Sequence, residues 1–403
     1  MISYSFKNTY FFLVSLFFFS LISCGQDLAS KKETFKKIET GAQQTTLYAN
    51  SLANKNIAVV ANQTSILLNT NGNHTHLVDS LVTLNYNILK VFSPEHGFRG
   101  DADAGEKVID GKDAKTGLPL ISLYGNNKKP TEEQLKGIDV VVFDIQDVGV
   151  RFYTYISTLH YVMEACAELE IPLIVLDRPN PNGHYIDGPT LEIEYTSFVG
   201  MHPIPVVYGM TIGEYAQMIN GEHWLKNKIQ CDLTVIPLKN YTHNKQYNLP
   251  VKPSPNLPNE KSINLYPSLC FFEGTNVSAG RGTEKQFQIF GSPFLSKNEF
   301  NFSFTPQPNF GAKNPKHKGL QCCGLDLSKI TYLNKIDISY LIKAYHATSD
   351  KEIFFNNFFT KLAGTKKLQQ QIENNTSIEE IYNSWQKGIA DFKKVRKTYL
   401  IYN

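Results

Sequence analysis

The sequence predicts an α/β protein in which a Rossmann-like parallel sheet, with helices on both faces, is followed by a smaller C-terminal α+β domain. Short apolar runs such as residues 57–60, 140–143 and 173–176 alternate with segments that have the apolar spacing of amphipathic helices. Strands that are apolar on both sides are typical of a parallel sheet covered by helices. From about Leu295 the chain changes to loops rich in Phe and Asn and then to mixed helices, which indicates a second domain.

The expected strands and helices alternate along the chain. Apolar runs at 57–60, 88–92, 119–124, 140–143, 173–176 and 233–236 are the expected strands, and segments at 76–84, 155–169 and 212–222 are the helices between them. Another helix is expected after Thr131, because residues 131–134 (TEEQ) have the spacing of a capping box. In the C-terminal domain, helices are expected at 338–346, 353–362 and 378–395.

The N-terminal residues have the order of an export signal. Lys7 supplies a positive charge, residues 10–22 are almost entirely apolar, and Ser23 and Cys24 follow. This apolar stretch is shorter than the roughly 20 residues of a spanning helix, so we expect it to be cleaved. Residues 21–24 (LISC) resemble a bacterial lipobox, which predicts a lipoprotein signal peptide over residues 1–23 and lipidation of Cys24. The alternative is an ordinary signal peptide with an incidental cysteine.

This reading places the mature protein in the cell envelope, lipid-anchored to a membrane and facing the periplasm. Residues 24–44 are polar and charge-rich, which indicates a tether. We expect a catalytic domain over residues 45–294 and an auxiliary domain over 295–403. The net charge is only +3 and no basic face is apparent, which argues against nucleic acid as a partner. The cysteines other than Cys24 show no Cys-x-x-Cys spacing and are expected as small buried side chains.

Polar side chains follow three of the expected strands. Residues 93–97 (SPEHG), 144–151 (DIQDVGVR) and 177–183 (DRPNPNG) each combine acids with basic or amide groups. Ligands of a parallel sheet bind beyond the carboxyl ends of its strands, and clustered carboxylates suit general acid–base chemistry. Taken singly, Asp144 or Asp177 could equally cap a helix. Glu95 differs, because it lies between Pro94 and His96 where no cap is needed.

The sequence lacks the motifs of several other classes of protein. No Gly-x-Gly-x-x-Gly follows the first strand, residues 280–284 (GRGTE) lack the Gly-Lys-Ser/Thr of a nucleotide P-loop, and no Gly-x-Ser-x-Gly elbow occurs. Asp101 and Asp103, with His96 and His202, match no metal-site spacing. We therefore expect no cofactor and no metal.

Four segments resemble the NamZ family of exo-β-N-acetylmuramidases: residues 93–100, 143–155, 176–181 and 273–283. The resemblance extends over about residues 53–402. It implies a Rossmann-like catalytic domain with a smaller C-terminal domain. It also implies an exo-acting glycoside hydrolase that releases N-acetylmuramic acid from the non-reducing ends of peptidoglycan fragments, so that its partners are peptidoglycan-derived muramyl saccharides. The alternatives are a non-catalytic lipoprotein that binds cell-wall sugars and an exo-N-acetylglucosaminidase.

The resemblance also implies a catalytic carboxylate at Glu95, at the end of a sheet strand. We expect Glu95 to act as general acid or base, with His96 and Asp144 beside it. Arg281 or Arg151 is our candidate for binding the lactyl carboxylate of muramic acid, because an arginine fork matches a carboxylate. The full set of residues expected to shape the sugar subsite is Arg151, Tyr153, Asn180, Asn276, Arg281 and Glu284.

Overall fold

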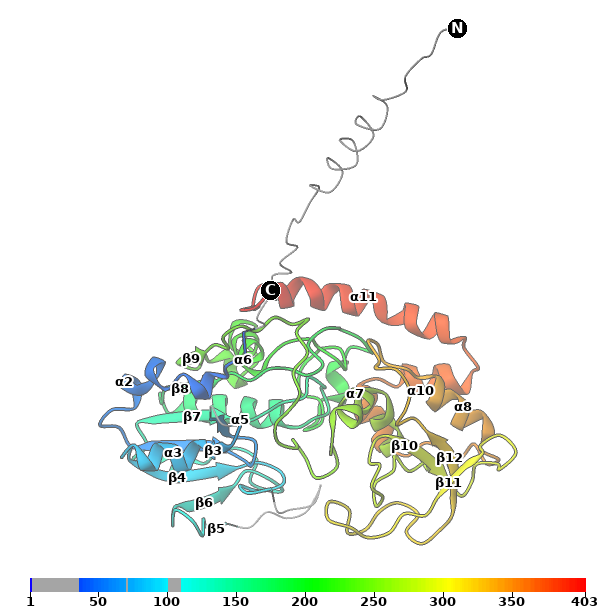
Figure 1. Cartoon of the computed structure of the whole chain (residues 1–403), viewed down its shortest axis with the longest axis horizontal. Helices are drawn as coiled ribbons and strands as arrows, with labels where there is room; N and C mark the ends of the chain where they lie inside the picture. Colours follow the sequence, from blue (N-terminus) through cyan, green and yellow to red (C-terminus); the bar gives the residue numbers. More distant parts are fainter. Residues whose placement is uncertain (2–35, 70–71, 101–109) are drawn as a thin grey trace. The chain divides into compact units, whose positions relative to one another are not determined.

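A seven-stranded sheet is the centre of the larger region in the computed structural model, which describes Met1 and residues 36–69, 72–100 and 110–403 (Figure 1). The predicted signal peptide, Cys24 and most of the predicted tether lie outside the described residues, as do Asp101 and Asp103. Among the residues that are described, no helix is both long and apolar enough to cross a membrane.

The strands of this sheet lie in the order β5-β6-β4-β1-β7-β8-β9, and all neighbours are parallel except β5 and β6. The predicted parallel sheet is therefore confirmed. Val60 of β1 pairs with Phe92 of β4 and with Phe143 of β7, so these three strands end level with one another. The strands are β1 (Ile57–Ala61), β4 (Ile88–Ser93), β5 (Gly111–Lys112), β6 (Pro119–Ser122), β7 (Val140–Asp144), β8 (Leu173–Leu176) and β9 (Leu233–Ile236).

Alternate residues of the central strands face two separate hydrophobic clusters. Val60 and Phe143 pack in one cluster with α5 (Tyr155–Glu168) and α6 (Ile212–Gly221), while Val59 and Val142 pack in the other with α3 (Leu77–Thr83) and α2 (Ala49–Leu52). Helices thus cover both faces, as predicted. The short helix α4 (Glu132–Leu135) begins with the expected capping box, in which Thr131 Oγ1 accepts from Gln134 N at 3.2 Å.

The chain after β9 builds a second region around an antiparallel sheet. Helix α7 (Glu260–Leu269) and the 3-10 helix η5 (Cys270–Gly274) lead into three strands in the order β10-β12-β11. These are β10 (Ile289–Ser292), β11 (Phe302–Phe304) and β12 (Cys322–Asp326). Helix α7 was not predicted, because it follows a proline-rich stretch and contains Pro267. The capping side chain of Asn259 accepts from Ser262 N and fixes its start.

Four helices complete this region: α8 (Ser339–Ala347), α9 (Phe358–Ala363), α10 (Lys367–Glu373) and α11 (Ile378–Lys397). The predicted helix at 353–362 is wrong in its first half, because Phe354 O accepts from Asn276 N and residue 355 bridges residue 275. Helix α10 was not predicted. The smaller elements are the hairpin β2 (Ile66–Leu68) and β3 (His74–His76) and the 3-10 helices η1 (Gly41–Gln43), η2 (Thr45–Leu47), η3 (Ile193–Tyr195) and η4 (Lys226–Lys228).

Helix α11 connects the two regions (Figure 1). Its buried side chains Ile381, Trp385, Ile389 and Phe392 recur at helical spacing, and the Arg396 guanidinium donates to Gly209 O near the sheet at 3.0 Å. Residues 38–403 accordingly form one compact unit, which contains both predicted domains, 45–294 and 295–403.

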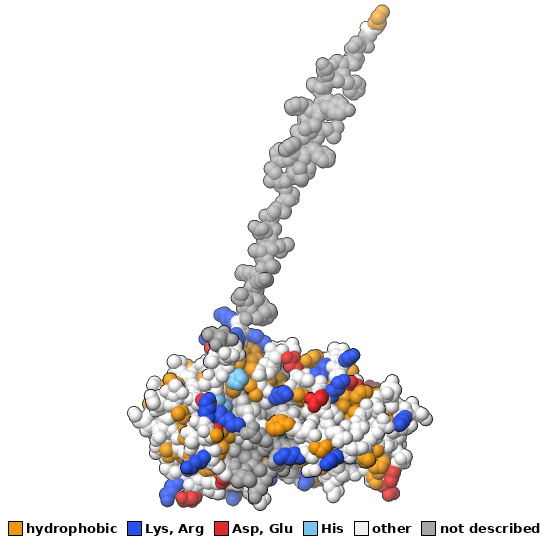
Figure 2. Space-filling view, turned by 60° about the horizontal axis from the view of Figure 1, so that its bottom comes forward, with side chains coloured by type: hydrophobic (Ala, Val, Ile, Leu, Met, Phe, Trp, Pro, Cys, Tyr) orange, Lys and Arg blue, Asp and Glu red, His pale blue; other side chains and the backbone are white. Residues whose placement is uncertain are grey.

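The surface charge and the cysteines can each be compared with what the sequence predicts. On the face that Figure 2 shows, Lys and Arg side chains are scattered with acidic side chains between them. The cysteines that the structure describes are free and buried, as predicted; they are Cys166, Cys231, Cys270, Cys322 and Cys323.

Candidate active site

Glu95 lies on the turn that follows β4. Gly97 N donates to Pro94 O at 3.1 Å, and His96 and Gly97 both have positive φ, 71° and 76°. The carboxylate is held from the start of α5, where Thr154 Oγ1 donates to Glu95 Oε2 at 3.0 Å. The sheet and the helix together therefore fix the direction in which this carboxylate points.

Glu95 lines a cavity of about 290 Å³. This volume is close to that of sites that bind small ligands. His96 lines the cavity beside Glu95, and Glu273 and Arg281 line it as well. The remaining lining is mostly aromatic and polar and includes Tyr124, Phe152, Tyr153, Thr154, Tyr155, Phe198, Ser254, Asn256, Tyr266, Cys270 and Phe287. The cavity therefore combines two carboxylates with aromatic rings and hydroxyl donors.

Glu273 is the second carboxylate of this cavity and was not predicted as a site residue. It lies on η5, and its Oε2 is 3.8 Å from Arg281 Nη1. Arg281 Nη2 also donates to Gly311 O at 3.3 Å, so the guanidinium is held on two sides. Glu273 opens the segment 273–283 that resembles the NamZ family, and that position was the available signal for it.

The loop that carries Glu273 is tied down by Lys316. Its Nζ donates to Phe272 O at 2.9 Å, to Thr275 O at 2.6 Å and to Val277 O at 3.1 Å. Burial lowers the pKa of Lys316, while the negative charge of Glu273 opposes that shift. This ammonium group thus holds the backbone on both sides of Glu273. Sequence reasoning missed it, because nothing local marks a lysine that binds carbonyls some 40 residues away.

Three tyrosines form one wall of the cavity. The rings of Tyr153 and Tyr155 meet edge to face with centroids 4.8 Å apart, and Tyr153 and Tyr266 do so at 6.0 Å. Tyr153 OH donates to Pro253 O at 2.7 Å. Burial raises the pKa of all three phenols, so their hydroxyls stay protonated at neutral pH. Of the predicted site residues, Glu95, His96, Tyr153 and Arg281 line this cavity.

Asp144 is not among the residues that line the cavity. It is fully buried at the end of β7, where Arg178 Nε donates to its Oδ1 at 2.6 Å and Arg178 Nη2 to its Oδ2 at 2.8 Å. Burial raises the pKa of Asp144, and the charge of Arg178 opposes that shift. The structure therefore places Asp144 in a buried ion pair, outside the lining of the cavity of Glu95.

Arg151 is also fully buried and lies outside the cavity lining. Its guanidinium donates to four backbone carbonyls, and burial lowers its pKa to about 9. These acceptors are Pro189 O at 2.8 Å, Ile204 O at 2.6 Å, Leu362 O at 3.0 Å and Ala363 O at 2.7 Å. Arg151 thus joins the sheet region to the end of α9.

The other predicted subsite residues also lie elsewhere than in the cavity lining. Asn180 is buried, with its Nδ2 donating to Met210 O at 2.8 Å. Asn276 holds both side-chain polar atoms buried without a hydrogen-bond partner among the described residues. Glu284 is exposed to solvent. Asn276 and Glu284 belong to a segment that reaches the cavity through Glu273 and Arg281, whereas no residue of the segment around Asn180 lines it.

The fold and the cavity define a class of protein: an α/β enzyme whose site pairs carboxylates in a sugar-sized, tyrosine-lined cavity, the arrangement that glycoside hydrolases use. Comparison with known proteins makes this specific. Residues 57–261 match the N-terminal domain of the exo-β-N-acetylmuramidase NamZ, and residues 264–402 match its C-terminal domain. The chain belongs to the NamZ family.

Individual relatives agree with this assignment. The chain is 42% identical to the peptidoglycan β-N-acetylmuramidase NamZ of Bacillus subtilis (strain 168), over 98% of this chain and 100% of the relative. A crystal structure of a DUF1343 family protein from Bacteroides fragilis is 46% identical with a TM-score of 0.84, and a second one is 30% identical with a TM-score of 0.75. Each alignment covers 91% of this chain and 99% of the other chain.

Proposed function

We propose that this protein is an exo-acting glycoside hydrolase that releases N-acetylmuramic acid from the non-reducing ends of peptidoglycan fragments. The family and the Bacillus subtilis relative support the activity. The observation that carries the proposal is the cavity after β4, in which Glu95 and Glu273 share one sugar-sized space with Arg281.

We assign the reacting groups to the two carboxylates of that cavity. One carboxyl group protonates the glycosidic oxygen as the bond from C1 to that oxygen breaks, and the other stabilises the positive charge at C1 or activates the water that replaces the leaving group. Glu95 is the general acid or base, since Thr154 holds it at the end of β4. Glu273 is the second carboxylate, and His96 lies next to Glu95 in the wall.

Recognition of muramic acid falls to Arg281. The lactyl group of this sugar carries a carboxylate, which a guanidinium binds through paired hydrogen bonds. Arg281 lines the cavity, whereas Nη1 and Nη2 of the other candidate, Arg151, donate to four backbone carbonyls. Tyr153 OH donates its proton to Pro253 O, so its oxygen can accept a hydrogen bond from a sugar hydroxyl.

The proposed site of action is the cell envelope. The sequence of residues 1–24 supports export and a lipid on Cys24, and the polar residues up to 44 would serve as a tether. A lipid on Cys24 keeps the enzyme where wall fragments are released. Metabolic labelling with palmitate tests this proposal, and the Cys24→Ala variant should lose the label.

A two-substrate assay tests the activity. Purified mature protein is given a chromogenic β-N-acetylmuramide and the matching β-N-acetylglucosaminide, and release from the muramide alone is expected. The Glu95→Gln variant should lose about 10²-fold or more in turnover. Glu379→Gln, an exposed acid on α11, is the matched control and should keep full activity. Release from the glucosaminide alone would identify a glucosaminidase, and release from neither sugar would identify a sugar-binding protein.

A further inference from the structure

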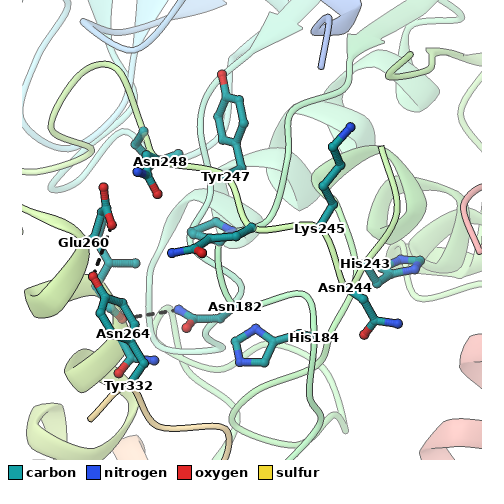
Figure 3. Close-up of a pocket in the computed structure, with 14 residues that line it drawn as sticks. Asn182, His184, His243, Asn244, Lys245, Tyr247, Asn248, Glu260, Asn264 and Tyr332 are labelled. Atoms are coloured by element: carbon teal, nitrogen blue, oxygen red, sulfur yellow. Dashed lines mark hydrogen bonds between the residues drawn. The ribbon is translucent and has the colours of Figure 1, made fainter. Parts of the chain in front are cut away.

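A second cavity, of about 390 Å³, lies apart from the one that contains Glu95 (Figure 3). No residue lines both cavities. Its walls come from the loop after β8, from residues 243–249 after β9, from the first turns of α7 and from Tyr332. Its volume lies within the ordinary range of small-ligand sites.

Helix α7 separates the two cavities. Tyr266 and Cys270, at and beyond its C-terminal end, line the cavity of Glu95, while Glu260, Ile263 and Asn264 on its first turns line the second cavity. The two sites therefore share one rigid element without sharing a side chain.

The floor of the second cavity is preorganised by buried amides. Asn182 Nδ2 donates to Val148 O at 2.9 Å. The side chain of Asn264 donates to Leu333 O and accepts from Leu333 N, both at 2.8 Å. Both amides are buried, so these hydrogen bonds fix the floor before any ligand arrives.

Tyr332 provides a fixed aromatic surface at the side of the cavity. Lys261 Nζ lies 4.1 Å from the ring centroid, and Tyr332 OH donates to Glu260 Oε2 at 3.1 Å. Tyr332 lines the cavity and Lys261 does not, so the lysine leaves part of the ring to the cavity wall. An aromatic face held in this way suits the apolar face of a sugar ring.

Free amide groups lie along the rim. Asn244, Gln246 and Asn248 are exposed, and their side chains form no hydrogen bond with any other residue that the structure describes. A side-chain amide both donates and accepts, which matches the hydroxyl and acetamido groups of an N-acetylated sugar.

The two cavities differ in charge. The second cavity carries one lysine, Lys245, and one carboxylate, Glu260, which balance each other. Partial burial lowers the pKa of His184, so this ring is neutral at neutral pH. In the cavity of Glu95, by contrast, Arg281 lies with two carboxylates, Glu95 and Glu273, and is our candidate for binding an anionic sugar. An uncharged ligand suits the second cavity better than a muramic acid carboxylate.

We propose that the second cavity is a non-catalytic binding site for an uncharged N-acetylated sugar, of the N-acetylglucosamine type. Its lining contains a single carboxylate, Glu260, which is engaged with Tyr332, so the site lacks the pair of carboxyl groups that hydrolysis requires. It holds a glycan without cutting it. This assignment does not depend on the role given to Glu95.

Titration of the mature protein with N,N′-diacetylchitobiose, followed by nuclear magnetic resonance, tests the proposal. Saturable binding is expected, and Tyr332→Ala should weaken it about tenfold or more, as loss of a central aromatic contact does at other binding sites. Asn248→Ala should weaken it less. Turnover of the small chromogenic muramide should be unchanged in both variants.

Tyr195→Ala is the matched control, because Tyr195 also lies under a lysine, with Lys366 Nζ 6.0 Å from its ring centroid, yet lines neither cavity. This control should bind chitobiose as the unchanged protein does. Three results would overturn the proposal: no saturable binding, equal binding by the Tyr332→Ala variant, or stronger competition by N-acetylmuramic acid than by N-acetylglucosamine. Loss of muramidase activity in Glu95→Gln with chitobiose binding intact would separate this site from the catalytic one.

Discussion

The turn after β4 and the loops after β7 and β8 begin alike, with acids at the ends of parallel strands, yet they do different work. The turn after β4 places Glu95 in the lining of a cavity, where Thr154 Oγ1 donates to its Oε2. The loops after β7 and β8 bury Asp144 and Asp177 completely. Arg178 neutralises the first acid, and hydroxyl and backbone donors surround the second.

This difference teaches that position at the end of a strand is not enough to make an acid catalytic. A buried acid whose oxygens already have donors serves the fold, because removing its partner leaves an uncompensated group. A carboxylate with one side toward a cavity can exchange a proton with a ligand. Variants of the two kinds should therefore separate activity from stability.

The largest effect is expected at the cavity carboxylates. Glu95→Gln and Glu273→Gln should each lower turnover of a β-muramide by about 10²- to 10⁴-fold, because each removes a proton donor or acceptor from the reaction. Thermal unfolding should change little, since both acids line the cavity and the ion pair of Glu273 with Arg281 is partly exposed. A Glu273→Gln variant with full turnover would remove Glu273 from the proposed mechanism.

Breaking the buried pair of Arg178 and Asp144 should cost a comparable free energy, measured in stability and not in turnover. Arg178→Met leaves the Asp144 carboxylate buried without its cation, which should cost about 3–5 kcal/mol of unfolding free energy in denaturant titrations. The double variant Arg178→Met with Asp144→Asn should recover part of that loss, because no buried charge remains. An Arg178→Met protein as stable as its parent would show that the pair is not structural.

The sheet could be predicted because its strands are locally distinctive. Residues 57–60 and 140–143 are apolar on both faces, and such a run has few alternatives in a soluble domain. The antiparallel sheet could not be predicted in the same way, since β11 and β12 are only partly apolar and contain Ser303 and Gly324. Helix α7 was hidden by Pro267 and by the prolines before it.

The part of the candidate site that lies just after a strand could be predicted from the sequence. Glu95 lies two residues beyond the end of β4, whereas the loop of Glu273 is held by Lys316 and Arg281, which lie farther along the chain. Arg151 looked like a ligand-binding arginine in the sequence. Its hydrogen-bond acceptors lie as far along the chain as Ala363, and hydrogen bonds between such distant residues leave no local pattern in the sequence.

A smaller effect is expected for substrate choice at Arg281. Arg281→Lys should raise KM for muramyl substrates by roughly tenfold, because an ammonium group cannot form the paired hydrogen bonds of a guanidinium. KM for a glucosaminyl analogue, measured with the same preparation, should change much less. Equal changes for both sugars would show that Arg281 does not bind the lactyl carboxylate.

The most gradual effect is expected in the pH dependence of stability, because it is spread over several pH units, and it distinguishes the buried acids from the cavity acids. Burial raises the pKa of Asp177 from 3.8 to about 7, although Tyr402 Oη, Thr211 Oγ1 and Gly213 N donate to it. A raised pKa in the folded state means that the folded protein binds the proton more tightly than the unfolded chain does. Its contribution is therefore full below pH 4 and is lost as the pH rises through about 7.

Between those two values the free energy of unfolding should fall by up to about 1.4 kcal/mol per pH unit from this group alone. Asp177→Asn removes the titrating proton, so the difference in stability between this variant and the parent should change with pH over that interval. The pH profile of kcat/KM should stay the same in the variant, because Asp177 lies outside the cavity of Glu95. A stability difference that is constant from pH 4 to 8, or a shifted kcat/KM profile, would contradict the separation between acids that serve the fold and acids that serve the reaction.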